Sequence, residues 1–92
     1  MQQTKSGDTL ILSGNIDTSS INVDVLHLFL NNIDGINKIV FQDVGHVDSS
    51  CVAIFVAAKR LLKEKFPTIE NIPPTMVDLL KLYNINDWIT ND

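Results

Sequence analysis

The segment from residue 38 to residue 65 limits the possible folds of this chain more than any other, because an apolar strand pattern passes directly into a helical pattern. Residues 39–41 are consecutive apolar side chains, which predicts a central strand covered on both faces. From residue 50 to residue 65 the spacing becomes helical. One stripe of that predicted helix carries Cys51, Ile54, Ala58, Leu61 and Leu62. A strand that leads straight into a helix is typical of α/β domains.

The first third of the chain has the same order of strand and helix. Residues 9–13 are β-prone, end at the turn residue Gly14, and are predicted to pair with residues 2–5 through a turn. Ser19 or Ser20 is predicted to cap the next helix. The expected buried face of that helix consists of Val23, Leu26, Leu30 and Ile33.

The last third adds one more strand and one more helix. Pro67 ends the preceding helix, and residues 68–72 predict a short strand. Thr75 and Asp78 fit the Ser/Thr-x-x-acid start of a helix. Its expected buried face consists of Val77, Leu79, Leu80, Leu82, Tyr83 and Ile85. We therefore expect a single α/β domain over residues 1–92, with a mostly parallel sheet of about four strands, about three packed helices and right-handed crossovers.

The charge of the chain narrows the choice of partners. A net charge of −4 and a pI of about 4.8 argue against binding to a nucleic-acid backbone. The basic residues Lys59, Arg60, Lys63 and Lys65 form a cluster that Glu64 partly offsets. We interpret this cluster as a solvated helix end that complements the helix dipole, with docking to an acidic partner or to lipid headgroups as the alternatives.

The single cysteine and the absence of a leader pattern or of an apolar run of about 20 residues predict a soluble, cytoplasmic protein. Neither a P-loop nor a dinucleotide-binding glycine motif occurs. His27, His46 and Cys51 lack metal-ligand spacing, so we expect neither a metal nor a cofactor. His46 is the one nearby base for Ser49, Ser50 or Cys51, without an evident group to orient it, and we expect no enzyme activity.

The best functional lead is the corner where the strand meets the helix, at Asp48, Ser49 and Ser50. The first turn of a helix has unpaired N–H groups and partial positive charge, so Asp48 or Ser49 is expected to act as an N-cap. The alternative is that one serine is an exposed hydroxyl that contacts a partner and accepts a phosphate.

The sequence Asp43-Val-Gly-His-Val-Asp-Ser-Ser50, preceded by Leu12-Ser-Gly-Asn-Ile-Asp17, resembles the STAS domain family of sulfate transporters and anti-sigma factor antagonists. The resemblance covers nearly the whole chain and implies a STAS-like fold. It also implies that Ser49, beside Asp48, is the phosphorylatable serine. Cys51 departs from the glycine that antagonists often have there. Residues 79–89 resemble the ending of the STAS subunits of bacterial intermembrane phospholipid-transport ABC complexes, in which threonine is usual at the position of Ser49.

The resemblance implies a non-enzymatic, cytoplasmic binding or regulatory subunit that docks on the ATPase subunit of such a transporter and is held at the inner membrane by that partner. The expected contact residues are Asp48, Ser49, Ser50, Val52, Phe55, Val56 and Lys59. For Val52 and Val56, burial in the domain is the competing interpretation. An anti-sigma factor antagonist, phosphorylated at Ser49 by a kinase-type anti-sigma factor, is the alternative function. A nucleotide-binding module is a third, weaker hypothesis.

Overall fold

The computed structural model describes residues 1–85 and 87 of the 92-residue chain. Residue 86 and residues 88 and 89 of the predicted C-terminal segment lie outside the described residues. The elements are β1 (Gln2–Ser6), β2 (Thr9–Ile16), α1 (Val23–Asn32), β3 (Lys38–Val47), α2 (Ser49–Leu62), the 3₁₀ helix η1 (Lys63–Lys65), β4 (Thr68–Glu70) and α3 (Pro74–Leu82).

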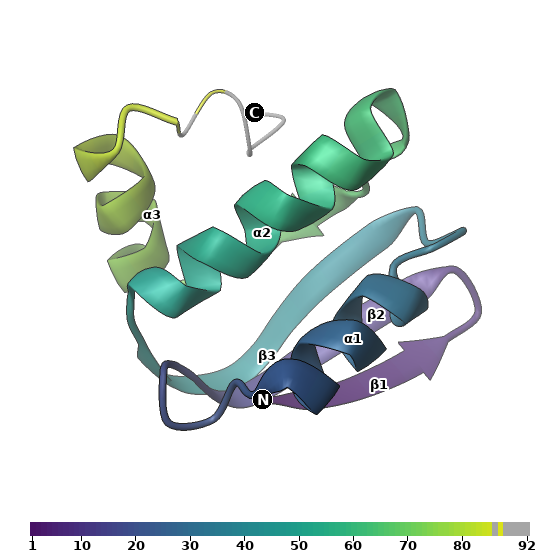
Figure 1. Cartoon of the computed structure of the whole chain (residues 1–92), viewed down its shortest axis with the longest axis horizontal. Coiled ribbons are helices and arrows are strands. Elements are labelled where there is room, and N and C mark those ends of the chain that lie inside the picture. The colour runs from purple at the N-terminus through teal and green to yellow at the C-terminus, as the bar shows by residue number, and fades with distance from the viewer. Residues whose placement is uncertain (86, 88–92) are drawn as a thin grey trace.

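The strands form one sheet in the order β1-β2-β3-β4. β1 and β2 are an antiparallel hairpin, whereas β2, β3 and β4 are parallel neighbours. This confirms the expected α/β domain with a mostly parallel sheet. Because both crossovers step in the same direction across the sheet, α1 and α2 lie side by side on one face of it, and α3 packs against α2 (Figure 1).

The central strand is covered on one face, not on both as its apolar sequence predicts. Ile39 and Phe41 point into the core and are buried, whereas Val40 between them is half-buried on the face opposite the helices. Ile11 pairs with Val40 and is likewise half-buried. The continuous apolar run was misleading because no helix among the described residues returns to that face.

The core lies between the sheet and the helix layer. Phe55 of α2 is fully buried at its centre, with ring centroids of Phe29 and Phe41 both 5.5 Å away and that of Phe66 6.4 Å away. Other fully buried side chains are Leu10, Leu12, Ile16, Ile33, Ile39, Met76, Leu80 and Cys51. All three helices and the sheet contribute, so the described part is one domain.

The pairing of β2 with β3 is irregular near the ends of the two strands, where the candidate site lies. β2 does not stop at Gly14 but continues to Ile16 through two register shifts against β3, so β3 carries extra, bulged residues. Gly14 and Asp43 both have positive φ, 77° and 53°. Gly14, where a turn was predicted, therefore stays within β2 and pairs beside the bulged residues of β3.

The helix termini also differ from the prediction. Asn22, not Ser19 or Ser20, caps α1, with its side-chain oxygen 2.9 Å from the Val25 N–H. Val23 is 66% exposed, while Phe29 takes the buried position. Ser20 instead bonds within the preceding loop, where its hydroxyl donates to the Asn15 carbonyl.

The buried faces of α2 and α3 match the prediction in part. Cys51, Ile54 and Ala58 of the predicted α2 stripe are buried, and Leu62 is half-buried. In α2, Leu61 is 61% exposed, whereas Phe55 is buried. α3 starts at Pro74 without a side-chain cap, so Thr75 does not form a capping box. Met76 and Leu80 provide its buried face, and Leu82 is 75% exposed.

Candidate partner-binding site

Parallel pairing of β2 and β3 brings two loops together at the ends of these strands. Ile16 pairs with Val47, so the loop that follows β2 lies beside the start of α2. Asn15 fastens the strand ends, because its Oδ1 accepts the His46 N–H at 2.9 Å. That side chain occupies the space that a Cβ on Gly45 would need. The corner is therefore built from two segments about 30 residues apart in sequence.

Asp48 is the N-cap of α2 and also clamps the neighbouring loop. Its Oδ1 accepts the Ser50 N–H at 2.8 Å, as an N-cap does. Its Oδ2 accepts the backbone N–H of Thr18 at 3.0 Å and the Thr18 hydroxyl at 3.1 Å. The Thr18 backbone bond is the largest cause of a lowered Asp48 pKa, with Ser50 adding to it and burial opposing it.

The Ser50 hydroxyl belongs to the same network. Its Oγ lies 2.8 Å from the Thr18 Oγ1. Thr18 has one hydroxyl proton and donates it to Asp48, so Ser50 is the donor to Thr18. Asp48 and Ser50 are thus engaged in holding the corner together.

Asp17 makes a second clamp beside the first. It is 8% exposed, accepts the Ser20 N–H at 3.0 Å, and lies 2.8 Å from the Nδ1 of His46. The His46 hydrogen bond is the main cause of a lowered Asp17 pKa, burial acts against it, and Ser20 adds to it. Asp17 is therefore the orienting group for His46 that the sequence did not reveal. The other ring nitrogen of His46 has no hydroxyl partner among the described residues, so no Ser–His–Asp triad is formed here.

Ser49 differs from its neighbours. It is the first residue of α2, it is exposed, and its hydroxyl makes no hydrogen bond within the described part of the chain. It stands at the rim of a hollow of about 550 Å³ between α2 and the end of α3. The hollow is lined by Ser49, Val52, Ala53, Val56, Arg60, Tyr83 and Ile85.

The structure divides the predicted contact residues into two groups. Ser49 is exposed, Val56 is half-buried, and both line the hollow. Phe55 was wrongly included, because its ring is fully buried among three other phenylalanines and has no surface to offer. Val52 is only 4% exposed and forms part of the floor. Lys59 does not line the hollow, and its ammonium lies 5.2 Å from the centre of the Phe66 ring.

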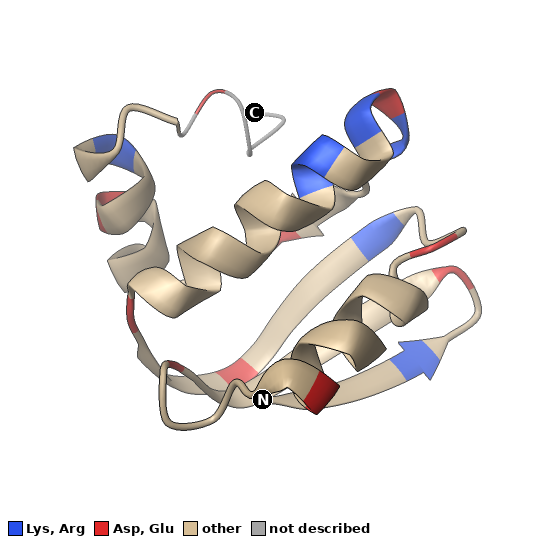
Figure 2. Cartoon of the chain, in the orientation of Figure 1, with Lys and Arg blue, Asp and Glu red and all other residues tan. Residues whose placement is uncertain are grey.

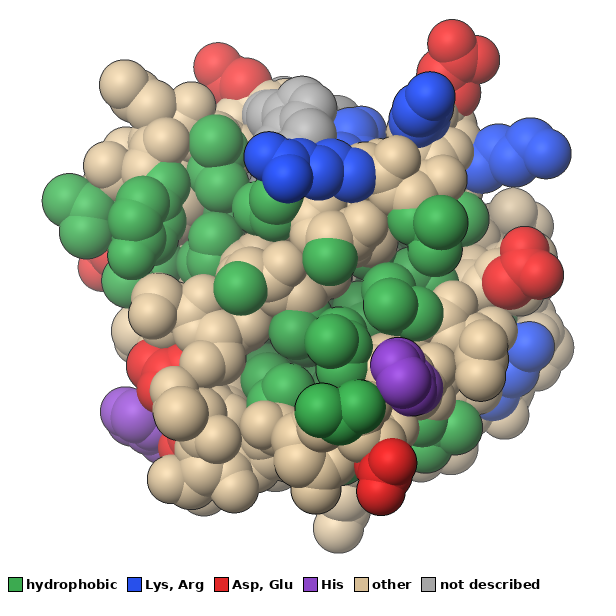
Figure 3. Space-filling view, viewed as in Figure 1, with side chains coloured by type: hydrophobic (Ala, Val, Ile, Leu, Met, Phe, Trp, Pro, Cys, Tyr) green, Lys and Arg blue, Asp and Glu red, His purple; other side chains and the backbone are tan. Residues whose placement is uncertain are grey.

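Sequence reasoning missed the other wall of the hollow. Tyr83 is 51% exposed and faces α2 across the hollow, although the sequence pattern assigned it to the buried face. Ala53 and Arg60 were not predicted either. Ala53 lies four residues after Ser49, and Arg60 lies seven residues after Ala53, so all three are on one side of α2. This spacing was visible in the sequence. Figure 3 shows hydrophobic side chains spread over this helical layer.

Cys51 is not a reactive group at this corner. Burial, with the Asp48 charge adding to it, raises the pKa of its thiol to about 12. Its sulfur lies 3.6 Å from the Met76 sulfur, inside the contact between α2 and α3. Residues 1–85 and 87 contain no group of three or more His, Cys, Asp or Glu side chains placed to hold a metal ion.

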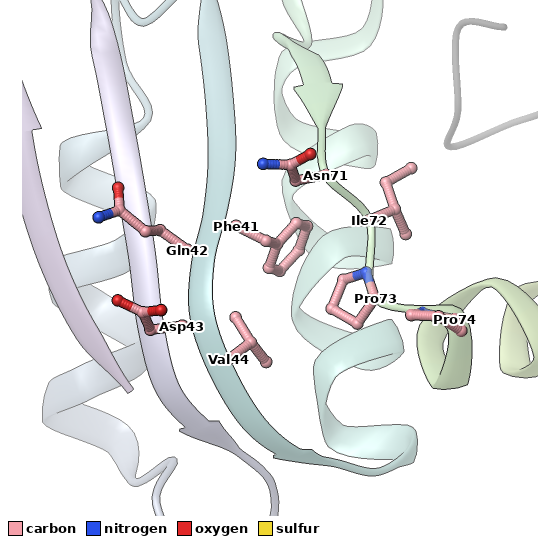
Figure 4. Close-up of a pocket in the computed structure, with 8 residues that line it drawn as sticks. All are labelled: Phe41, Gln42, Asp43, Val44, Asn71, Ile72, Pro73 and Pro74. Atoms are coloured by element: carbon pink, nitrogen blue, oxygen red, sulfur yellow. The ribbon is translucent and has the colours of Figure 1, made fainter.

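A second hollow, of about 480 Å³, lies where β4 leaves the sheet. Phe41 and Val44 face the Asn71–Pro74 segment across it, while Gln42 and Asp43 point to the other side of β3 (Figure 4). It exists because β4 pairs for three residues only and the following prolines have no N–H to donate to β3. Polar groups do not converge on it from its two sides, so it carries little recognition chemistry.

These features define a small α/β domain with a rigid, hydroxyl-bearing corner beside an apolar hollow. No family model matches the sequence, and no curated protein matches it. No helix among the described residues combines the length and the apolar character needed to cross a bilayer.

Proposed function

We propose that this chain is a non-enzymatic binding subunit of the STAS type, similar to MlaB, that docks on the ATPase of a phospholipid-transport ABC complex. The observation that carries the proposal is the free hydroxyl of Ser49 beside the hollow between α2 and α3. An exposed hydroxyl on a rigid corner next to an apolar hollow suits a protein partner better than a small substrate, since no catalytic groups converge there from residues 1–85 and 87.

The clamps on either side of Ser49 support the same proposal. Thr18, Asp48 and Ser50 bond to one another and so fix the start of α2. A preorganised surface loses little conformational entropy on association. The corner therefore presents Ser49 and the first turns of α2 without rearrangement.

The test is association of the full chain with the ATPase subunit of a phospholipid-transport ABC complex from the same organism. Ser49→Asp and Ser49→Lys should weaken co-purification by about tenfold or more, because each buries a charge at an apolar contact. Ser49→Thr keeps the hydroxyl and adds one methyl at the rim of the contact, where most contacts are energetically near neutral, so it should bind within about threefold. Equal thermal unfolding of all three variants shows that the fold is intact. Unchanged co-purification of the charged variants would remove the corner from the interface.

A second candidate function is an anti-sigma factor antagonist that is phosphorylated at Ser49. The favouring observation is that Ser49 is exposed and its hydroxyl has no hydrogen bond to any residue that the structure describes. The Ser50 and Thr18 hydroxyls, in contrast, are engaged with each other, and Thr18 also with Asp48. Incubation with a kinase-type anti-sigma factor and ATP should add one phosphate to the wild type and to Ser50→Ala, and none to Ser49→Ala. A phosphate mapped to Ser50 or Thr18 would contradict this assignment.

A further inference from the structure

The far end of α2 carries a charge distribution unlike that of the rest of the molecule. Four of the seven Lys and Arg residues fall between Lys59 and Lys65, although the chain as a whole has a net charge of −4. Figure 2 shows the first turns of α2 free of charged residues and its far end basic. α2 has 14 residues, so this end lies about 20 Å along the helix from Ser49.

The backbone at the tip of this end has an unusual conformation at Lys63. Lys63 has φ 53° and ψ −116°, a conformation that favours glycine. Glycine at position 63 would adopt this conformation with less strain, whereas lysine places a positive charge at the C-terminal end of α2. Lys63 and Lys65 are exposed, and neither belongs to an ion pair in the part of the chain that the structure describes.

A hollow of about 470 Å³ opens beside these charges, between the C-terminal ends of α1 and α2. Its lining residues are Leu30, Asn31, Asp34, Leu61, Leu62 and Lys65. Leu61 is 61% exposed, so an apolar wall is available to a partner next to the basic tip. Asp34 on the opposite side is an acceptor that can take an N–H from a bound main chain.

We propose that this basic end binds an acidic segment of a partner protein, with one leucine-like side chain in the hollow and flanking carboxylates on Lys63 and Lys65. Charge complementarity favours an acidic occupant, because the end of α2 and η1 carries four Lys and Arg residues against two carboxylates, Glu64 and Asp34. Lys65 lines this hollow and Lys63 is exposed at the tip, whereas Arg60 lines the hollow beside Ser49 and Lys59 lies over the Phe66 ring. A polypeptide fits better than a membrane, because a flat lipid surface places no single side chain in a hollow and would repel the rest of this acidic chain.

The test uses a labelled 12-residue peptide with one leucine flanked by glutamates at helical spacing, titrated into the full wild-type chain. We expect saturable binding that weakens with salt, since exposed charges are screened. The Lys63→Glu/Lys65→Glu variant should lose about tenfold in affinity. Lys5→Glu/Lys81→Glu makes the same change in net charge elsewhere and should bind as the wild type does. A peptide with its leucine replaced by asparagine should bind more weakly than the parent.

Backbone amide shifts of the isotope-labelled chain then locate the peptide. Shifts confined to the ends of α1 and α2 and to η1 support the proposal, and shifts at the Ser49 corner overturn it. Equal loss in both double variants also overturns it, because net charge alone would then explain binding. The proposal is also overturned if the chain sediments with phosphatidylserine-containing vesicles and shows no saturable binding of the peptide. These outcomes are independent of the ATPase-binding test, which changes Ser49 alone.

Discussion

Asp48 connects two elements through separate oxygens, one to the start of α2 and one to the loop before α1. An N-cap could be expected from its position before an apolar helical pattern. The Thr18 contact could not, because it depends on how β2 and β3 align over a separation of 30 residues. At the scale of single residues, sequence predicts local hydrogen bonds better than those made across the fold.

Replacing Asp48 with alanine should lower the free energy of unfolding by about 2 to 3 kcal/mol, because the cap and the two Thr18 bonds are lost together. Urea unfolding followed by circular dichroism measures the change. Asp78→Ala, an exposed aspartate on α3, is the matched control and should stay within about 0.5 kcal/mol of the wild type. Similar losses in both variants would show that Asp48 has no special structural role.

The stabilising contribution of Asp17 should depend on pH. Its pKa in the folded chain is lowered from the ordinary value of 3.8, so the stabilisation is complete above that value and is lost as the pH falls through the lower, folded-state pKa. The stability difference between the wild type and Asp17→Asn should therefore be largest near neutral pH and shrink below about pH 4. A difference that stays constant from pH 7 to pH 3 would contradict this assignment.

Gly45 and Asn15 should be coupled energetically. Alanine at position 45 displaces the Asn15 oxygen that accepts the His46 N–H, and we expect a cost of about 1 to 2 kcal/mol. In an Asn15→Ala background the obstacle is absent, so Gly45→Ala should cost less. A double-mutant cycle measured by urea unfolding gives the coupling energy. Simple additivity would rule out the proposed contact.

At the scale of elements, the sequence predicted that α2 exists, where it starts and that Cys51, Ile54 and Ala58 are buried. It did not predict that Phe55 is buried or that Leu61 is exposed. The first three turns of α2 are apolar on several sides, so the stripe through Leu61 and the stripe through Phe55 fit the periodicity about equally. The sheet decides, because Phe55 meets Phe29 and Phe41 there. The cap of α1 was missed for a related reason: Ser20 and Asn22 are both good caps, and tertiary bonds engage Ser20 elsewhere.

Truncating Phe55 and Leu61 should distinguish the buried face of α2 from its exposed face. Phe55→Ala should cost about 3 to 5 kcal/mol, because it leaves a cavity among three aromatic rings. Leu61→Ala, on the same helix but exposed, should change stability by less than about 1 kcal/mol. Thermal and urea unfolding of both variants provide the comparison, and a larger loss at Leu61 would reverse the assignment of faces.

At the scale of the whole molecule, the alternation of strands and helices was enough to predict an α/β domain. It was not enough to predict that α1 and α2 share one face, because that depends on the order of strands in the sheet. The Asp48 corner was visible as a motif, whereas the hollow beside Ser49 was not, since Tyr83 and Ile85, which follow α3, complete it. Hollows of this kind depend on how helices pack against each other, which the sequence pattern does not specify.

The one-sided sheet predicts an asymmetry between two valines of β3. Val47→Thr places a hydroxyl at a buried position and should cost about 1 to 3 kcal/mol. Val40→Thr, the same change on the uncovered face, should cost less than about 1 kcal/mol, because threonine suits a half-buried strand. Urea unfolding of the pair measures the difference, and equal costs would indicate that something covers the open face.

The buried thiol of Cys51 gives the molecule an internal reporter of motion. At pH 8, a pKa of about 12 leaves about one thiol in ten thousand ionised in the closed state, so a thiol-directed reagent reacts through opened molecules. Because the sulfur faces Met76, undocking of α3 is one way to expose it. The labelling rate of the unmodified chain would therefore follow the opening of α3 away from α2, and a partner that closes this contact would slow it.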